Sequence, residues 1–457
     1  MLTYLRKNMK GIMIVVAILF GFSMFYGIGF TGLKQFSDNS KKTQGFLKVN
    51  GKEINPMRFN NIFSRLRANF PDRINPSDIL FLQNMALSQT IDFSIILDEA
   101  RKTVGVSGGE LNLALEQIAK QEKLTTVAEL KKAVESSHIP WDKFKKMIKD
   151  DLLVQKMTSQ INNSVMVSPN DLREIRASHI LVKTKELADE IKNKIQKGGD
   201  FAAQAKKYSQ DLGTKNKGGD LGFFSSGMMV KPFEDMAFSL AVSEVSEPVK
   251  TDYGYHIIKV TDARLRKIQG QKDIEAAVLK EKQANAYKEW FYNLKKNAKI
   301  EILDPGLKAL DLRFKGQISG AIKEYNRAIS LDPGNAYLKL FLGLLYEDSK
   351  NLKQAIFQYR EAVQLEPANP VLYMVLGKAY IKDNQKGLAI EQLKKASLIA
   401  GDDKGMHKEL QKEFAALKLS SLAAGERDEI IRIEKKEAFE EELREKTSDS
   451  KEKIVID

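Results

Sequence analysis

The sequence contains no cysteine and only four histidines among its 457 residues. The absence of cysteine excludes disulfide bonds, thiolate metal sites and a cysteine nucleophile. The small number of histidines also argues against a histidine-rich metal site, so we expect no metal. Because oxidising and reducing compartments both suit a chain without thiols, the cysteine count leaves the compartment open.

Charge of one sign is not gathered in one block of the chain. Lys and Arg number 73 and Asp and Glu 60, which gives a net charge of +13. Such an excess is also found in nucleic-acid-binding proteins. Here the basic residues are spread along the chain and mixed with acids, as in Lys183 to Glu186 and Glu434 to Glu437. Mixed runs are typical of solvated helix faces, so we predict no nucleic-acid partner.

Long apolar runs are rare, and Gly11 to Leu33 is the one long stretch without charge. As a helix it would span about 34 Å, enough to cross a hydrocarbon core of about 30 Å. A cleaved signal peptide is the alternative, but the run exceeds the usual apolar length of about 7 to 15 residues. We therefore expect a cytoplasmic N-terminus at 1–10 and an uncleaved, single-pass anchor at 11–33 in a bacterial inner membrane. The rest of the chain would lie in the periplasm.

Residues 45–172 carry mostly helical patterns. They open with a strand-like piece, Phe46 to Val49, and an Asn50-Gly51 turn. Ser107 and Glu110 have the spacing of a capping box at the start of a helix. Amphipathic segments follow at 126–134 and 140–160. The region is either a helical scaffold or an apolar cradle for unfolded polypeptide.

Val-Asn-Gly-Lys-Glu-Ile at 49–54, followed by these helices, resembles the N-terminal domain of SurA/PpiD-type periplasmic chaperones. In that family the N-terminal helices pack with a later helix that follows an inserted domain. A helical pattern at 274–298 and a strand-like piece at 299–302 occupy the corresponding place. The resemblance therefore implies a chaperone-like domain at 45–172 that is completed by 266–304.

Two strand patterns between these segments each contain a histidine. Alternation over 173–182 places His179 among apolar residues, and the pattern at 255–260 does the same for His256. One inward-facing histidine is more often structural than catalytic, because a buried polar atom must find a partner. Two in one short module suggest a pair that meets across a sheet.

Four blocks of this module form its most specific pattern: Ala177 to Val182, Gly218 to Gly222, Lys231 to Glu234 and Thr251 to Ile258. Their order and spacing resemble the parvulin peptidyl-prolyl isomerases over 173–265. The resemblance implies an α+β fold, a small antiparallel sheet with surrounding helices. It also implies cis–trans isomerisation of X-Pro bonds in polypeptides, a reaction that needs no nucleophile and no cofactor.

The resemblance also implies roles for single residues. His179 and His256 match the paired histidines, and Asp211 matches the position that is cysteine or aspartate among parvulins. Thr251 would join the hydrogen-bond network around the histidines. The apolar pocket that receives the proline ring is matched by Leu221, Met229 and Phe233.

The C-terminal part of the chain repeats with a period of 34 residues. This offset separates three small residues, Ala321, Ala355 and Ala389. The repeats resemble tetratricopeptide repeats over 305–400 and predict an all-α solenoid. Its concave surface would bind a protein partner, unless the repeats serve stability alone. Residues 401–457 are charge-dense and predict a helix around 427–446 within a solvated cap or tail.

The sequence thus predicts a multidomain folding factor, anchored in the membrane and exposed to the periplasm. Its helical domain would hold unfolded proteins, and its parvulin domain would isomerise their X-Pro bonds. Two alternatives differ in class. In one, the parvulin module is catalytically silent and the protein is a chaperone; in the other, the protein is an envelope scaffold whose repeats recruit partners.

Overall fold

The computed structural model describes residues 45–68, 75–137, 139–268, 270 and 273–453. The expected N-terminus at 1–10 and the expected anchor at 11–33 lie outside these residues. The chain forms two compact units: one comprises Met1–Asp151 with Asn297–Asp457, and the other is Leu152–Lys296.

The first unit begins with a small sheet that joins distant parts of the chain. Strands β1 (Leu47–Val49), β2 (Lys52–Glu53) and β7 (Ile300–Ile302) are antiparallel in the order β2-β1-β7. Asn50 and Gly51 both have positive φ, 51° and 76°, as a two-residue hairpin turn of type I′ requires. Residues 266–304 were expected to complete the helical domain. Within this range, β7 pairs with β1 of the first unit, whereas α11 (Ile274–Lys296) belongs to the second unit.

Helices make up the rest of the N-terminal region: α3 (Pro56–Ala68), α4 (Pro76–Thr103), α5 (Gly108–Gln121), α6 (Val127–Ser136) and α7 (Trp141–Asn163). The capping box of Ser107 and Glu110 is present at the start of α5. Among the described residues, α4 alone has the length and composition of a membrane-spanning helix, and 56% of its most apolar window is buried in the protein. Leu80 near its N-terminus packs into the core of the repeats.

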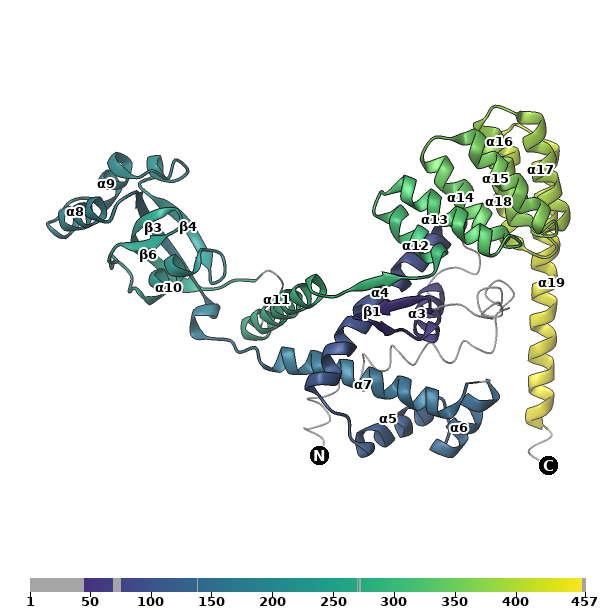
Figure 1. The fold of residues 1–457 in the computed structure, drawn as a ribbon, viewed down its shortest axis with the longest axis horizontal. Helices are drawn as coiled ribbons and strands as arrows, with labels where there is room; N and C mark the ends of the chain where they lie inside the picture. Colours follow the sequence, from purple (N-terminus) through teal and green to yellow (C-terminus); the bar gives the residue numbers. More distant parts are fainter. Residues whose placement is uncertain (1–44, 69–74, 138, 269, 271–272, 454–457) are drawn as a thin grey trace. The chain divides into compact units, whose positions relative to one another are not determined.

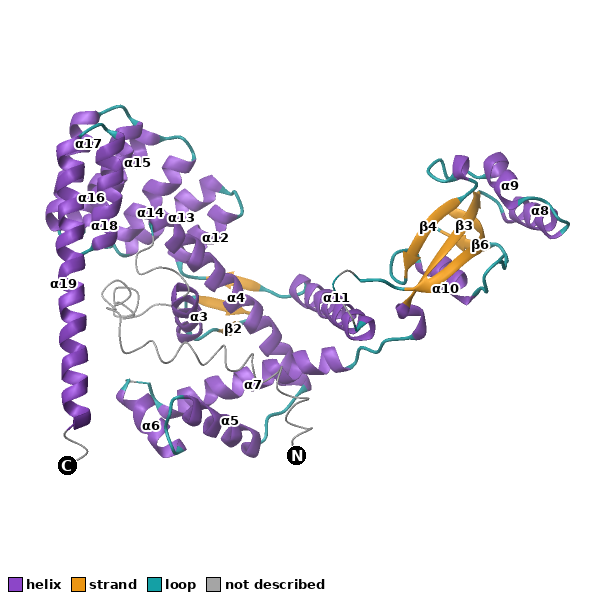
Figure 2. Cartoon of the chain, turned by 180° about the vertical axis from the view of Figure 1, so that it is seen from behind, coloured by secondary structure: helices purple, strands orange, loops and turns teal. Residues whose placement is uncertain are grey.

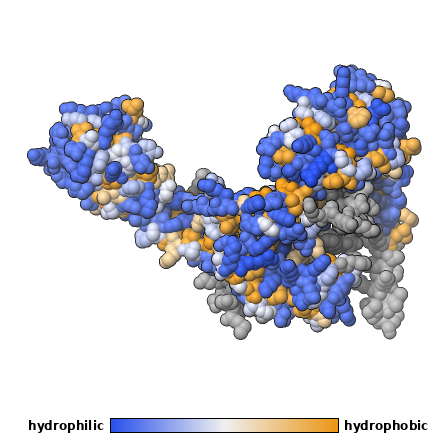
Figure 3. Space-filling model, viewed as in Figure 1, coloured by the Kyte–Doolittle hydropathy of each residue, from blue (hydrophilic) through white to orange (hydrophobic). Residues whose placement is uncertain are grey.

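The repeats form pairs of antiparallel helices, stacked as neighbours in Figure 1. The pairs are α12 (Pro305–Phe314) with α13 (Ile318–Leu331), α14 (Ala336–Asp348) with α15 (Leu352–Leu365), and α16 (Pro370–Lys382) with α17 (Lys386–Ile399). The periodic small residues Ala321, Ala355 and Ala389 are fully buried between helices. In the view of Figure 3, hydrophilic side chains cover most of the visible surface of these helices, which fits the mixed charges of the sequence.

A fourth helix pair continues the stack beyond residue 400. It consists of α18 (Lys404–Ala416), which the sequence analysis did not predict, and α19 (Ser420–Lys453), which is longer than the predicted helix at 427–446. Met406, Leu410 and Phe414 of α18 are buried in a cluster with residues of α16 and α17. The buried His407 Nδ1 lies 2.6 Å from Glu426 Oε2, which ties α18 to α19. Part of the charge-dense segment is therefore a packed end of the solenoid.

Replacing either of two helical glycines of this unit by alanine should change the stability of the protein, in opposite directions. A Cβ on Gly343 would lie 2.4 Å from the ring of Tyr359, whose hydroxyl is held by Glu347 at 2.8 Å, whereas a Cβ on Gly425 meets nothing within 4 Å. We expect Gly343→Ala to lower the free energy of unfolding by about 1–3 kcal/mol. Gly425→Ala should raise it by about 1 kcal/mol, because alanine favours the helix. Urea unfolding followed by circular dichroism measures both free energies. A lower free energy of unfolding for Gly425→Ala would contradict the placement of Gly425 at an open position of a helix.

The second unit contains a four-stranded antiparallel sheet, drawn in orange at the right of Figure 2. Its order is β4-β3-β6-β5, formed by β3 (Arg173–Val182), β4 (Asp220–Ser225), β5 (Val249–Thr251) and β6 (Gly254–Leu265). The covering helices are α8 (Lys185–Gln196), α9 (Phe201–Tyr208) and α10 (Lys231–Ser239). Ile180 and Val182 pack against α8 and α9, whereas Ile175 and Ala177 pack against α10. The two faces of β3 thus serve two separate cores.

Candidate active site

The pairing of the two central strands brings the predicted histidines together. In the antiparallel register of β3 and β6, Leu181 lies opposite His256. Side chains two residues apart share a face, so His179 and His256 are diagonal neighbours on one side of the sheet. Their rings stack with centroids 5.3 Å apart, and the two Nδ1 atoms are 3.1 Å apart. Both side chains are buried, at 6% and 5% exposure.

Hydrogen bonds extend this pair in both directions. His179 Nε2 lies 2.8 Å from Asp211 Oδ2, which comes from the loop after α9. On the other side, His256 Nε2 lies 2.8 Å from Thr251 Oγ1 at the end of β5. All four polar residues that the sequence predicted for the site therefore form one continuous chain.

The partners at its ends give this chain a direction. The carboxylate of Asp211 accepts the Nε2 proton of His179, which leaves His179 Nδ1 to accept from His256 Nδ1–H. Thr251 Oγ1 accepts the N–H of Tyr253 at 3.1 Å, so its own proton is free to reach His256 Nε2. This pattern of hydrogen bonds places a proton on His256 Nδ1 and none on His256 Nε2, so His256 must be neutral. Burial, and then the neighbouring His179, lower the pKa of His256 to about 4, which keeps it neutral at neutral pH.

Asp211 stays ionised although it is partly buried. Burial raises the pKa of its carboxyl, but hydrogen bonds from Thr214 and His179 and from the N–H of Gly213 outweigh that effect and hold the pKa below its ordinary value. Its side chain keeps 28% exposure, so the negative charge lies at the rim of the site. Thr214, which the sequence analysis missed, donates to Asp211 and lies 3.1 Å from His179 Nε2.

The three predicted pocket residues also lie together. Phe233 on α10 is 3% exposed, and its ring is perpendicular to both imidazoles, with centroids 5.8 Å from His179 and 5.3 Å from His256. Leu221 and Met229 are half-buried against the same cluster. The site therefore combines an apolar floor with a polarised hydrogen-bond chain beside it.

The glycine-rich turn before β4 brings the backbone close to His179. Gly219 has a φ of +84°, and its carbonyl oxygen accepts the N–H of His179 at 2.9 Å. A Cβ at this position would lie 2.3 Å from the backbone oxygen of His179. Within the described residues, no group of three or more His, Cys, Asp or Glu side chains is arranged to hold a metal ion.

Comparison with known families divides the chain in the same order as its motifs. Residues 1–158 match the family described as SurA-like N-terminal domain, and residues 156–264 match the PPIC-type PPIASE domain. Residues 336–369 match the tetratricopeptide repeat.

Similar proteins span different shares of the chain. A Foldase protein PrsA from Caldanaerobacter subterraneus subsp. tengcongensis is 30% identical in an alignment of 309 residues that covers 63% of this chain and 97% of that relative. A Foldase protein PrsA from Geobacillus sp. (strain WCH70) is 48% identical over 172 residues, 35% of this chain and 61% of that relative. The second match thus covers less than two thirds of the relative's length.

Two solved structures are similar to different lengths of the chain. The crystal structure of the peptidylprolyl isomerase PrsA from Bacillus anthracis is 30% identical and covers 46% of this chain and 95% of that chain, with a TM-score of 0.27. The solution structure of NmPin, the parvulin of Nitrosopumilus maritimus, is 51% identical and covers 20% of this chain and 97% of that chain, with a TM-score of 0.19.

Proposed function

Because the chain belongs to the PrsA foldase family and carries a parvulin-type peptidyl-prolyl isomerase domain, we propose that it is a membrane-anchored folding factor that holds unfolded proteins and isomerises their X-Pro bonds. The observation that carries the proposal is the hydrogen-bonded chain from Thr251 through both histidines to Asp211, set beside the apolar floor of Phe233. No group outside the chain is needed for this chemistry.

The reaction is a rotation about an amide bond. In water it is slow because twisting the bond breaks amide resonance, at a barrier of ~18–20 kcal/mol. We propose that Phe233, Leu221 and Met229 hold the proline ring while the preceding amide leaves water. Removal from water disfavours the planar, charge-separated form relative to the twisted form, which lowers the barrier.

The polar residues would act on the carbonyl that precedes the proline. In the planar amide this oxygen carries more negative charge than in the twisted one, so the Asp211 carboxylate beside it would destabilise the planar form. His179, His256 and Thr251 are then positioning residues that fix the orientation of Asp211 through their tautomers. The burial of both histidines supports this assignment, because a buried network whose polar groups are all hydrogen-bonded is rigid.

The remaining parts of the chain would bind client proteins and anchor the protein in the membrane. We propose that residues 45–172 with 266–304 hold unfolded polypeptide and that the parvulin domain at 173–265 acts on it. The repeats at 305–400, extended by the packed helix of the 401–457 segment, would bind a protein partner. The uncharged stretch at 11–33 supports a single membrane anchor, with the bulk of the chain on the far side, the periplasm of a bacterium with two membranes.

An Asp211→Asn variant tests the assignment of the polar chain. Asparagine keeps the shape of the side chain and an oxygen that accepts from His179, but it removes the charge. We expect kcat/KM for an unphosphorylated X-Pro peptide to fall about tenfold, less than the effect of removing a fully buried oxyanion donor. NMR exchange with the full chain measures the rate.

The matched control is Asp252→Asn, which removes the same charge from the exposed turn between β5 and β6. It should leave the rate unchanged. Equal rates for Asp211→Asn and the wild type would refute the electrostatic role of Asp211.

A further inference from the structure

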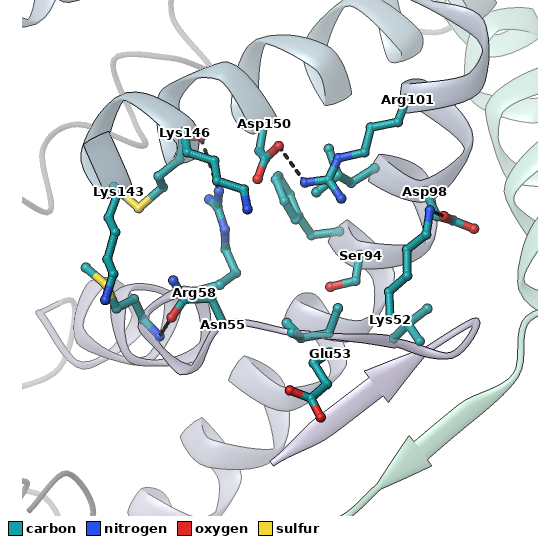
Figure 4. Close-up of a pocket in the computed structure, with 16 residues that line it drawn as sticks. Lys52, Glu53, Asn55, Arg58, Ser94, Asp98, Arg101, Lys143, Lys146 and Asp150 are labelled. Atoms are coloured by element: carbon teal, nitrogen blue, oxygen red, sulfur yellow. Dashed lines mark hydrogen bonds and ion pairs between the residues drawn. The ribbon is translucent and has the colours of Figure 1, made fainter. Parts of the chain in front are cut away.

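The N-terminal region of the first unit contains a cavity of about 260 Å³ that belongs to no part of the isomerase site. Three segments line it: the β1–β2 hairpin with the start of α3, the C-terminal part of α4, and the first half of α7. Figure 4 shows Lys143 and Lys146 of α7 on one side and Lys52 and Asp98 on the opposite side. Its volume lies below the range of about 300–1,000 Å³ that is usual for small-molecule sites, so it suits one or two side chains better than a cofactor.

The inner surface of the cavity is apolar. Phe93, Leu97 and Met147 contribute to its lining, together with Val49 and other apolar residues. The hydroxyl of Ser94, which also lines it, already donates to the carbonyl oxygen of Thr90 at 2.7 Å. The interior therefore favours an apolar side chain over a polar one.

The mouth of the cavity carries more cations than anions. Five basic and three acidic side chains line it, and three of the five cations are neutralised by ion pairs. These pairs are Lys52 with Asp98 at 2.5 Å, Arg58 with Asp151 at 2.6 Å, and Arg101 with Asp150 at 2.8 Å. The Arg58 guanidinium also lies over the Phe93 ring, 4.0 Å from its centroid, which fixes both groups in the wall.

Lys143 and Lys146 are the two remaining cations. Both are exposed and lie on α7 one helical turn apart, at the same edge of the cavity. In the part of the chain that the structure describes, neither amine has a carboxylate within 4 Å. An apolar interior with two unpaired amines at its edge is complementary to a ligand that carries an apolar group next to an anion.

We propose that this cavity binds a segment of unfolded polypeptide in which a large apolar side chain stands next to acidic residues. The apolar side chain enters between α4 and α7, and the carboxylates reach Lys143 and Lys146. This inference rests on the proposed holding function and adds to it a site and a preferred client sequence.

The test uses the full chain and labelled peptides without proline, which removes binding through the isomerase site. One peptide has a central Phe flanked by Glu, and matched peptides replace the Glu by Lys or the Phe by Ser. The Glu-flanked peptide should bind about tenfold more tightly than the Lys-flanked one, and this preference should shrink as salt is added. Replacing Phe by Ser should cost at least a further tenfold, because the interior of the cavity stays unfilled.

Two variants of α7 localise the effect. Lys146→Glu reverses a charge at the edge of the cavity, and Lys149→Glu makes the same change on an exposed residue of the same helix that does not line it. Only Lys146→Glu should remove the preference for acidic peptides. The inference would be overturned if both variants bound the Glu-flanked peptide with equal affinity. It would also be overturned if the wild type bound the Glu-flanked and Lys-flanked peptides equally well.

Suppression of client aggregation, measured on the same samples, separates the two hypotheses. A wild type that suppresses aggregation but shows no acidic preference retains the holding function and loses the cavity as its site. A wild type that neither binds these peptides nor suppresses aggregation overturns both.

Discussion

A Gly219→Ala variant is expected to lose roughly 3–5 kcal/mol of stability in the parvulin domain. Two costs add at this position. A φ of +84° is strained for alanine, and the new Cβ would lie 2.3 Å from the backbone oxygen of His179. Since that atom belongs to the central strand β3, it can move only with the strand. Hydrogen exchange of the β3 and β4 amides in the full chain measures the loss.

Gly222, three residues further on in β4, supplies the matched control. It also has a positive φ, +72°, but a Cβ there meets nothing within 4 Å. Gly222→Ala should therefore cost about 1–2 kcal/mol, the strain of the backbone alone. Equal losses in the two variants would mean that the close approach to His179 does not contribute.

The sequence was sufficient to predict the structure where the interacting residues follow a local pattern. Alternation over 173–182 predicted β3 with its observed ends, and the Ser107 capping box is present as predicted. The meeting of His179 and His256 was also predictable, because two strands that each place a histidine on an apolar face have few ways to share a sheet. The period of 34 residues predicted the helix pairs of the repeats for a similar reason, because every repeat has the same local sequence pattern.

The sequence was insufficient where partners are polar or far apart in the chain. Thr214 stands three residues after Asp211, a spacing at which a hydroxyl commonly bonds a carboxylate, yet a polar loop offers many such pairs. In α18 the apolar residues Met406, Leu410 and Phe414 do form a stripe, but the surrounding charges indicated a solvated cap or tail. Their partners, among them Leu393 on α17, become neighbours only through the superhelical stacking of the repeats.

The strongest effect on activity is expected for Phe233→Ala. A proline ring presents three CH₂ groups, each worth about 0.8 kcal/mol when buried, so loss of the pocket floor removes about 2.4 kcal/mol of transition-state binding. We therefore expect kcat/KM for an X-Pro peptide to fall about 50-fold. The measurement is NMR exchange with the full chain. Phe233→Leu, which keeps more of the packing volume, should show a smaller loss in the same direction if the alanine variant unfolds the domain.

Phe238 provides the comparison that separates pocket from core. It lies on the same helix, is buried in the same cluster and packs edge-on against Phe224, 6.0 Å between centroids. Within the described residues, the ring of Phe233 packs edge-on against His179 and His256, whereas the ring of Phe238 packs against Phe224. Each alanine variant should lose about 3–5 kcal/mol of stability, since each deletes a buried phenyl ring. Because only Phe233 touches the histidines, equal losses of kcat/KM in the two variants, with both folded, would show that Phe233 acts through packing and does not form the proline pocket.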